Sequence, residues 1–385
     1  MNSNKLRIFV TTSHSSTIYM TMLARHSRQP GDTDVLMIDT GFRREGLIRL
    51  MFEAADLHHW DIRHNFSDPV DTGYDFRPTP FKTFTRKVKG WPVIRNAYRL
   101  LLNKHMRKRD ARYRDELRRL LPSSSKTVEL FLMTETYINR PLQQLFPQAN
   151  IFYMEHGMGD YYHVLSRHII PGKMYCVFGP SYRRYLAAQG MTTEWILDLP
   201  GKETFRTLAA ELMTKHAATL RRETLPATGK PIVFILLESV HMYNVPDRYW
   251  TEYIDHILQQ LEAPSEYHYL LKPHPFHSKH HLQLTVNHIR KLGLSFDLLG
   301  SDELSSISAE VLFSHYATQV RHAFCIFSSS VYYLSEFYSN GNVTFWQSID
   351  FLSGYIGNAP PQFRKLYTEI NPLVKAVFID KCKTF

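Results

Sequence analysis

The chain has 385 residues, 44% of them hydrophobic, and carries a formal net charge of +10. This length predicts two domains at roughly 100–200 residues each, and no apolar run reaches the roughly 18–20 residues that a membrane-spanning helix needs. The first apolar run, residues 6–10, is too short for a signal-peptide core, so we expect a soluble cytoplasmic protein. The three cysteines lie far apart in the sequence and form neither a disulfide framework nor a metal knuckle. The positive charge favours a polyanionic partner: a nucleic acid, an acidic membrane face or an acidic polysaccharide.

Short apolar runs rich in β-branched and aromatic residues alternate with helical stretches along the chain. Such runs are typical of the buried strands of parallel sheets. The expected strands are residues 6–10, 35–38, 128–132, 151–154, 174–178, 232–237, 267–271, 325–327 and 343–345. The pattern predicts an α/β protein with two doubly wound, Rossmann-like domains that face a cleft. Because ligands bind beyond the carboxyl ends of parallel strands, we expect functional residues directly after these runs.

The alternation of strands and helices breaks near residues 200–230. Leu199-Pro200-Gly201 is a stop signal, a polar helical stretch follows, and residues 225–231 form a loop that contains Pro and Gly. The expected units are a first domain over residues 1–205, a second over residues 206–360, and a C-terminal segment over residues 361–385 that packs back on the first domain.

A polar loop that includes Ser13 and His14 follows the first expected strand, and it is a candidate substrate loop. It lacks the G-x-G-x-x-G fingerprint of dinucleotide-binding domains, and no G-x-x-x-x-G-K-[ST] motif occurs in the chain. These absences argue against NAD-dependent enzymes and P-loop ATPases.

Residues 86–119 contain thirteen Lys or Arg against three acids, with apolar residues spaced among them. This composition predicts a basic, amphipathic helix. Its polar face is a solvated surface, a docking surface for an acidic chain or an attachment patch for an anionic membrane, and the sequence leaves the three open. The candidate contact residues on this surface are Arg107, Lys108, Arg109 and Arg112.

Glu155 follows the expected strand 151–154 and precedes Gly157 and Gly159. Glycines let the backbone turn tightly and let a ligand approach closely. Burial at such a position raises the pKa of a carboxyl above its reference of about 4.3, toward the value that a general base needs. Glu155 is therefore a candidate general base, and Gly157 is a candidate substrate contact. The alternative for Glu155 is a carboxylate that caps a helix or pairs with an arginine.

Residues 272–275, Lys-Pro-His-Pro, follow the expected strand 267–271. The two prolines restrict the backbone on both sides of His274. A His held in this way, beside the positive charge of Lys272, suits the stabilisation of a departing phosphate. The alternative is a His that only packs in a loop.

Three more histidines follow this segment: His277, His280 and His281. Their spacing matches no common zinc pattern, and no carboxylate lies among them in the sequence. We therefore expect no metal site here, and we identify no metal ligands elsewhere in the chain.

Ser328, Ser329 and Ser330 follow the expected strand 325–327 and precede an apolar, helix-like run. Hydroxyls and free backbone N–H groups at the start of a helix form an anion site. The simpler alternative is that one serine caps the helix. Three serines in a row favour a phosphate-binding turn.

The segments Glu155-His156-Gly157, Lys272-Pro273-His274-Pro275 and Ser328-Ser329-Ser330, in this order, resemble motifs of the two-lobed, metal-independent bacterial sialyltransferases. Those families carry an acidic D/E-D/E-G motif in the first lobe, and His-Pro and Ser-Ser/Thr motifs in the second. The form here is most similar to the bacterial polysialyltransferase family, the capsule polymerases. One position departs from the pattern: His156 stands at the second acidic position, so no second carboxylate is carried over.

This resemblance implies a GT-B architecture and an inverting, metal-independent transfer of sialic acid from CMP-sialic acid to the non-reducing end of oligo- or polysialic acid, with no cofactor. It implies that Glu155 takes the proton of the acceptor hydroxyl and that His274 assists the departure of CMP. The residues implied to bind CMP and its phosphate are Lys272, Pro275, Ser328, Ser329 and Ser330. The implied partners are the polyanionic glycan, the CMP-sugar donor, and the inner membrane face or capsule-assembly proteins as peripheral contacts.

Two alternatives stay open at this point. The same scaffold suits another CMP-linked acidic sugar such as Kdo, or the addition of one sialic acid to a lipooligosaccharide. A basic nucleic-acid-binding protein is the distant alternative. The chain carries neither a zinc-finger spacing nor RNP aromatics, so we expect no nucleic-acid partner.

Overall fold

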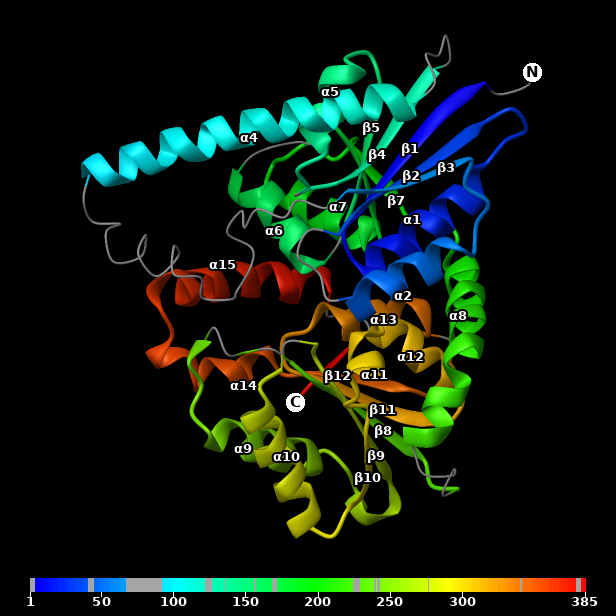
Figure 1. The fold of residues 1–385 in the computed structure, drawn as a ribbon. Helices are drawn as coiled ribbons and strands as arrows, with labels where there is room; N and C mark the ends of the chain where they lie inside the picture. Colours follow the sequence, from blue (N-terminus) through cyan, green and yellow to red (C-terminus); the bar gives the residue numbers. More distant parts are fainter. Residues whose placement is uncertain are drawn as a thin grey trace.

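The computed structural model describes residues 4–40, 45–66, 92–121, 127–134, 136–155, 157–167, 172–223, 229–238, 240, 243–275, 277–339, 341–378 and 382–385. Within them the chain forms two lobes, each built on one parallel sheet flanked by helices (Figure 1). This architecture confirms the predicted α/β class with two Rossmann-like domains.

The first lobe contains a seven-stranded sheet in the order β3-β2-β1-β4-β5-β6-β7. Its strands are β1 (Lys5–Thr11), β2 (Thr33–Asp39), β3 (Ile62–Phe66), β4 (Thr127–Met133), β5 (Asn150–Met154), β6 (Lys173–Cys176) and β7 (Ile196–Asp198). All neighbours pair in parallel, and Ile8 of β1 lies between Val35 of β2 and Leu130 of β4. Because these three side chains are fully buried, the apolar run that predicts each strand is also what fixes it in the sheet.

The second lobe contains a six-stranded parallel sheet in the order β10-β9-β8-β11-β12-β13. Its strands are β8 (Ile232–Leu237), β9 (His268–Pro273), β10 (Ser295–Leu298), β11 (Val320–Cys325), β12 (Thr344–Gln347) and β13 (Lys383–Thr384). Every residue of β8 and β9 is buried, as expected for the central strands of a sheet covered on both faces.

Helices connect the parallel strands. Those before β8 are α1 (His14–Ser27), α2 (Glu45–Ala55), α4 (Pro92–Leu120), α5 (Asn139–Leu145), α6 (Met158–Arg167), α7 (Gly179–Ala188) and α8 (Lys202–Glu223). Those after β8 are α9 (Arg248–Leu258), α10 (Lys279–Lys291), α11 (Asp302–Ser306), α12 (Ala309–Tyr316), α13 (Ser329–Phe337), α14 (Ile349–Ser353) and α15 (Pro361–Val377).

The strands that the sequence predicted are the interior strands of the two sheets, and those it did not predict are the four edges: β3, β7, β10 and β13. Edge strands are covered less completely, so polar residues interrupt their apolar runs. β3 alternates partly exposed and exposed residues before Phe66, and both residues of β13 are exposed. Four interior strands are shifted by a few residues: β6 and β11 begin and end before their predicted bounds, and β9 and β12 begin and end after theirs.

Helix α8 joins the two lobes, and the predicted boundary between residues 205 and 206 falls inside it. Lys215 of α8 donates a hydrogen bond to the backbone of Glu53 in the first lobe, at 3.2 Å. Phe205 stacks on Phe337 of the second lobe, with ring centroids 4.0 Å apart. The chain therefore crosses between lobes along a helix that packs on both.

The C-terminal segment also contacts both lobes. Phe378, just after α15, packs edge-on against Tyr161 and Phe178 of the first lobe, at 5.1 and 4.8 Å between ring centroids. The last strand, β13, pairs with β12 at the edge of the second sheet. The end of the chain thus reaches back to the first lobe and also completes the second sheet.

Helix α4 spans 29 residues and runs across the first lobe, with one end extending beyond the sheet (Figure 1). Its C-terminal half packs on the lobe through the buried side chains of Tyr113 and Leu117. Among the described residues, no helix combines the length and the apolar character needed to cross a membrane.

Candidate active site

The two lobes meet where the loop after β5 faces the start of α13. A Cβ atom added to Gly157 would lie 3.5 Å from the hydroxyl oxygen of Ser329. Gly157 has a φ of +150°, a conformation that side chains other than glycine rarely adopt. The structure therefore brings together two segments that the sequence singled out separately, one from each lobe.

Glu155 lies at the end of β5 and is fully buried. Among the described residues, neither of its carboxylate oxygens makes a hydrogen bond. Burial raises the pKa of Glu155 well above its ordinary value, and the charge of Asp160 adds to this shift. The hydroxyl of Tyr333 and the backbone of Val177 are polar neighbours that oppose the shift. A carboxyl in such surroundings has a strong tendency to take up a proton.

His14 is buried at the start of α1, and its Nδ1 accepts a hydrogen bond from the backbone N–H of Ser308 in the second lobe, at 3.2 Å. Burial, with the nearby charges of His216 and Lys272, lowers the pKa of His14 to about 3. The ring is therefore neutral, and because Nδ1 is the acceptor, the proton is on Nε2. Within the described part of the chain, Nε2 has no hydrogen-bond partner. An N–H donor is thus held between the lobes.

Ser13, the other residue predicted in this loop, caps α1. Its hydroxyl accepts a hydrogen bond from the backbone N–H of Ser16, at 3.2 Å. The hydroxyl of Ser16 in turn accepts one from the backbone N–H of Ser13, at 2.9 Å. This reciprocal capping fixes the turn that places His14 between the lobes.

Lys272, in β9, is buried and points inward. Its amino group donates hydrogen bonds to the carbonyl oxygens of Pro273, at 3.0 Å, and Ser305, at 2.7 Å. Burial lowers the pKa of Lys272 to about 7, and the charge of Glu310 opposes this shift. The amino group therefore ties β9 to the end of α11, and its contact with a nucleotide stays a prediction.

His274 follows β9 and is exposed, unlike Lys272, while Pro275 is partly buried. The backbone N–H of His274 donates to the carbonyl of Leu237 at 2.8 Å, and the carbonyl of His274 accepts from the N–H of His277 at 2.8 Å. These bonds, together with the flanking prolines, hold the backbone of His274 at the carboxyl end of the second sheet.

The structure identifies one functional candidate that the sequence reasoning missed: Glu238, directly after β8. Its carboxylate accepts hydrogen bonds from the backbone N–H groups of Ile326, Phe327 and Ser328, at 2.6–2.8 Å. Its carbonyl also bonds to Nδ1 of His277, at 2.9 Å. Glu238 therefore links the loop of His274 to the turn of the three serines. The signal that could have found Glu238 is the one that pointed to Glu155: a carboxylate directly after a buried strand.

The backbone N–H groups of residues 326–328, just before α13, bind the carboxylate of Glu238. Burial raises the pKa of Glu238 to about 7, and the three N–H groups oppose the shift. The hydroxyl of Ser328 caps α13 by accepting from the N–H of Ser330, at 3.2 Å, as in the simpler of the two interpretations. Phosphate binding by Ser328, Ser329 and Ser330 stays a prediction.

We expect Glu238→Ala to destabilise the second lobe by about 3 kcal/mol or more, because three backbone N–H groups lose their acceptor at about 1–3 kcal/mol each. Urea unfolding measures this loss. Glu262→Ala, which removes an exposed carboxylate of the same lobe, is the matched control and is expected to change stability by less than about 0.5 kcal/mol. Equal stability of the two variants would contradict the structural role of Glu238.

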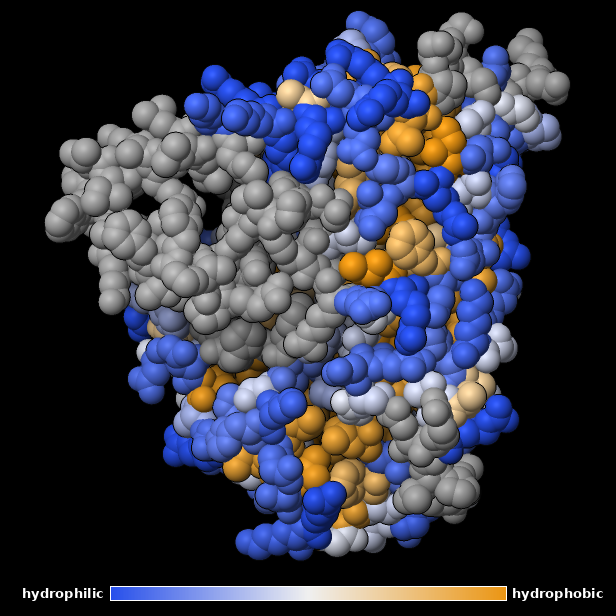
Figure 2. Space-filling model, in the orientation of Figure 1, coloured by the Kyte–Doolittle hydropathy of each residue, from blue (hydrophilic) through white to orange (hydrophobic). Residues whose placement is uncertain are grey.

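The basic surface of α4 differs from the prediction at one residue. Arg107, Lys108 and Arg112 are exposed, as expected for a docking face. Arg109 is buried: its guanidinium lies 4.0 Å from the ring centroid of Tyr137 and 3.2 Å from Asp110. Because the helix turns about 100° per residue, consecutive basic residues cannot all face the solvent. Figure 2 shows the hydrophilic surface over the described part of this helix.

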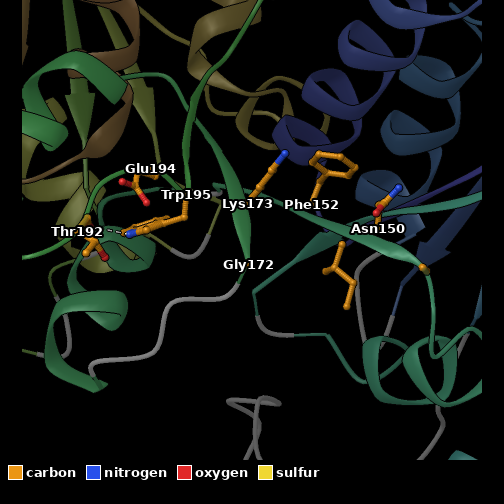
Figure 3. A pocket seen from close by; sticks show the side chains of 9 residues that line it. Asn150, Phe152, Gly172, Lys173, Thr192, Glu194 and Trp195 are labelled. Carbon is orange, nitrogen blue, oxygen red and sulfur yellow. Dashed lines mark hydrogen bonds between the residues drawn. The ribbon is translucent and has the colours of Figure 1, made fainter.

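A pocket of about 730 Å³ lies elsewhere, at the amino ends of β5 and β6. Figure 3 shows the indole of Trp195 beside Thr192, to whose carbonyl its N–H donates at 2.9 Å, while Lys173 and Phe152 lie farther along the sheet. Glu155 is at the other end of β5. Since ligands of open parallel sheets bind at the carboxyl ends, the pocket is not the candidate active site.

Comparisons with known proteins identify a family and several similar structures. A model of the alpha-2,8-polysialyltransferase (POLYST) family matches residues 39–347, which is most of the chain. The chain is similar in structure to the UDP-GlcNAc 2-epimerase of Neisseria meningitidis bound to UDP-GlcNAc, with a TM-score of 0.52, 10% identity, and coverage of 95% of this chain and 93% of that one. It is also similar to a glycosyltransferase of Rickettsia africae, with a TM-score of 0.45, 10% identity, and coverage of 90% and 80%. No curated protein matches the sequence.

Proposed function

Because the chain belongs to the alpha-2,8-polysialyltransferase family, we propose that it transfers sialic acid from CMP-sialic acid to the end of a growing polysialic acid chain. The observation that carries the proposal is Glu155: a buried carboxyl with no hydrogen bond among the described residues, on the first lobe, beside the Gly157–Ser329 contact with the second. A general base at this place lies next to the lobe expected to hold the nucleotide.

In the proposed reaction the acceptor hydroxyl attacks the anomeric carbon of the donor, and the bond from that carbon to the CMP phosphate breaks. Glu155 takes the hydroxyl proton, and the electron pair of the broken bond goes to the phosphate. His274 stabilises the departing phosphate by a hydrogen bond or a proton. A single displacement of this kind inverts the anomeric centre. We expect the chemical step to proceed in EDTA, because His274 and the serine turn supply the stabilisation of the leaving group.

The buried position of Glu155 adds a condition. A glycan hydroxyl reaches a fully buried carboxyl only if the lobes separate where Gly157 faces Ser329. His14 of the first lobe and Ser308 of the second form a further contact that this movement breaks. We therefore propose that the described arrangement is a closed form, and that substrate binding needs a more open one.

The test is incubation of the purified chain with CMP-sialic acid and a fluorescent oligosialic primer. A ladder of products that grows with time is the expected result. Addition of a single sugar would instead assign a single-addition transferase, and transfer only from CMP-Kdo would assign another donor. No transfer from either donor, together with salt-sensitive DNA binding, would overturn the proposal.

The exposed basic residues of α4 fit a polyanionic acceptor. We expect the triple reversal of Arg107, Lys108 and Arg112 to Glu to slow the extension of long primers by about tenfold or more, because a basic surface concentrates an acidic chain. Transfer to the shortest primer that the enzyme accepts is expected to stay within about twofold of the wild type. Product length on denaturing gels measures the effect.

Reversal of Arg118 and Arg119, two exposed residues at the end of the same helix, is the control for charge alone. If both sets of reversals shorten the products equally, the effect is one of overall charge and not of this surface. An unchanged product length, with weaker binding to anionic vesicles, would assign this face of α4 to a membrane instead.

A further inference from the structure

Three side chains with metal-binding groups meet on the second lobe, at residues distinct from those of the candidate active site. Asp247 immediately precedes α9, while His280 and His281 lie in the first turn of α10. The two helices lie side by side (Figure 1). One carboxylate oxygen of Asp247 is 3.0 Å from Nε2 of His280, and the other is 3.8 Å from Nε2 of His281. One ligand atom from each of the three side chains lies within 4.8 Å of the other two.

These separations are close to those that a metal ion imposes. A tetrahedral Zn²⁺ with bonds of about 2.0–2.2 Å holds its ligand atoms about 3.3 Å apart. Asp247 and His280 are exposed, so small side-chain rotations complete the geometry. His281 is mostly covered, and its ring stacks on the buried ring of Trp250, with centroids 5.0 Å apart. One ligand is therefore already oriented, and the other two are free to close on the ion.

The donor set also selects the kind of ion. Two imidazoles and one carboxylate suit Zn²⁺, Cu²⁺ or Ni²⁺, whereas Mg²⁺ and Ca²⁺ prefer oxygen ligands. The three cysteines of the chain, which are stronger zinc ligands as thiolates, are buried and do not compete. We propose that Asp247, His280 and His281 form a binding site for a divalent transition-metal ion, with the remaining coordination positions open to water.

The site is connected to the loop of His274. A bound ion would join the start of α9 to the start of α10, the helix that follows this loop. His277 packs edge-on against Trp250, at 4.6 Å between centroids, and its backbone N–H donates to the carbonyl of His274. We infer that the ion stabilises this loop. The inference does not depend on the proposed function, because its test measures binding and not turnover.

The experiment titrates the chain, without a histidine tag, with ZnCl₂. Calorimetry measures the binding, and the melting temperature is measured with and without the ion. One saturable site per chain and a rise in melting temperature are expected. His280→Ala, His281→Ala and Asp247→Asn should each weaken binding at least about tenfold, since even outer partners of metal ligands contribute about 10–100-fold. MgCl₂ at the same concentration should have neither effect.

The matched control is His288→Ala. His288 and Asp255 form a similar pair between the same two helices, at 2.6 Å, with only one imidazole. This variant is expected to bind Zn²⁺ like the wild type. With CuCl₂, the electron paramagnetic resonance spectrum should show coupling to two imidazole nitrogens, and to one in His280→Ala or His281→Ala. Absence of saturable zinc binding, or equal binding by the His281→Ala variant, would overturn the proposal.

Discussion

Glu155→Gln is expected to lower the turnover number by about 10²–10⁴-fold, the usual contribution of a general base. Gln has nearly the same shape as Glu but cannot take the proton of the acceptor hydroxyl. Because the change is confined to the base, the affinity for CMP, measured by calorimetry, is expected to stay within about twofold. Transfer to the fluorescent primer measures turnover, and a normal rate would remove Glu155 as the base.

Glu129→Gln provides a matched control for this variant. Glu129 is a carboxylate on the neighbouring strand β4, where it pairs with Lys5 at 2.7 Å. Its replacement removes a charge from the same sheet without changing the end of β5, so turnover is expected to be unchanged. A similar loss of activity in both variants would point to damage to the sheet and not to a lost base.

Glu155→Gln also has an expected effect on the stability of the protein. Folding raises the pKa of Glu155, chiefly because of burial, well above the ordinary 4.5. A carboxyl with a raised pKa favours the folded state at low pH, and this contribution is lost as the pH rises through the raised value. Gln does not titrate in this range. The melting temperature of Glu155→Gln, compared with that of the wild type, should therefore increase as the pH rises above about 4.5.

His274→Ala is expected to lower turnover by about 10²–10⁴-fold as well, because the phosphate then departs without the hydrogen bond or proton that His274 supplies. The side chain is exposed and the backbone is held by bonds to Leu237 and His277, so the fold is expected to survive the substitution. The affinity for CMP should fall, while that for cytidine, which has no phosphate, should not. Calorimetry with both ligands separates a phosphate contact from a general defect.

His280→Ala is the control for this second variant, since it removes an exposed His of the same lobe that lies outside the proposed catalytic residues. Its turnover is expected to match that of the wild type in EDTA. Full activity of His274→Ala would show that departure of the leaving group needs no help from this residue.

The sequence predicted the interior of both sheets and the positions of the candidate residues because both depend on local signals. A buried strand needs a continuous apolar run, and the residue that follows it lies at the ligand-binding edge by the geometry of parallel sheets. This reasoning found Glu155 and His274. The edge strands escaped it, because a strand such as β3 is only partly covered and keeps polar residues between its apolar ones.

Contacts between distant segments were beyond the reach of the sequence. Arg109 looked like its basic neighbours, and only the packing of α4 on Tyr137 buries it. The three serines suggested an anion site, but no spacing rule shows that Glu238, ninety residues earlier than Ser328, supplies the anion. In both cases a partner from a distant part of the chain decided the outcome: Arg109 was predicted at an exposed surface and is buried, and the N–H groups before the serines bind a carboxylate of the protein itself.

What the sequence determined by itself is the α/β class, the interior strands and the two segments around Glu155 and His274, since each follows from neighbouring residues. The tertiary structure decided which of these residues meet. It brings Gly157 against Ser329, and it brings Asp247 to His280 and His281, where the sequence showed histidines without a carboxylate. The physical reason is that strand and turn preferences act over a few residues, whereas a site is assembled by the packing of helices and sheets from separate parts of the chain.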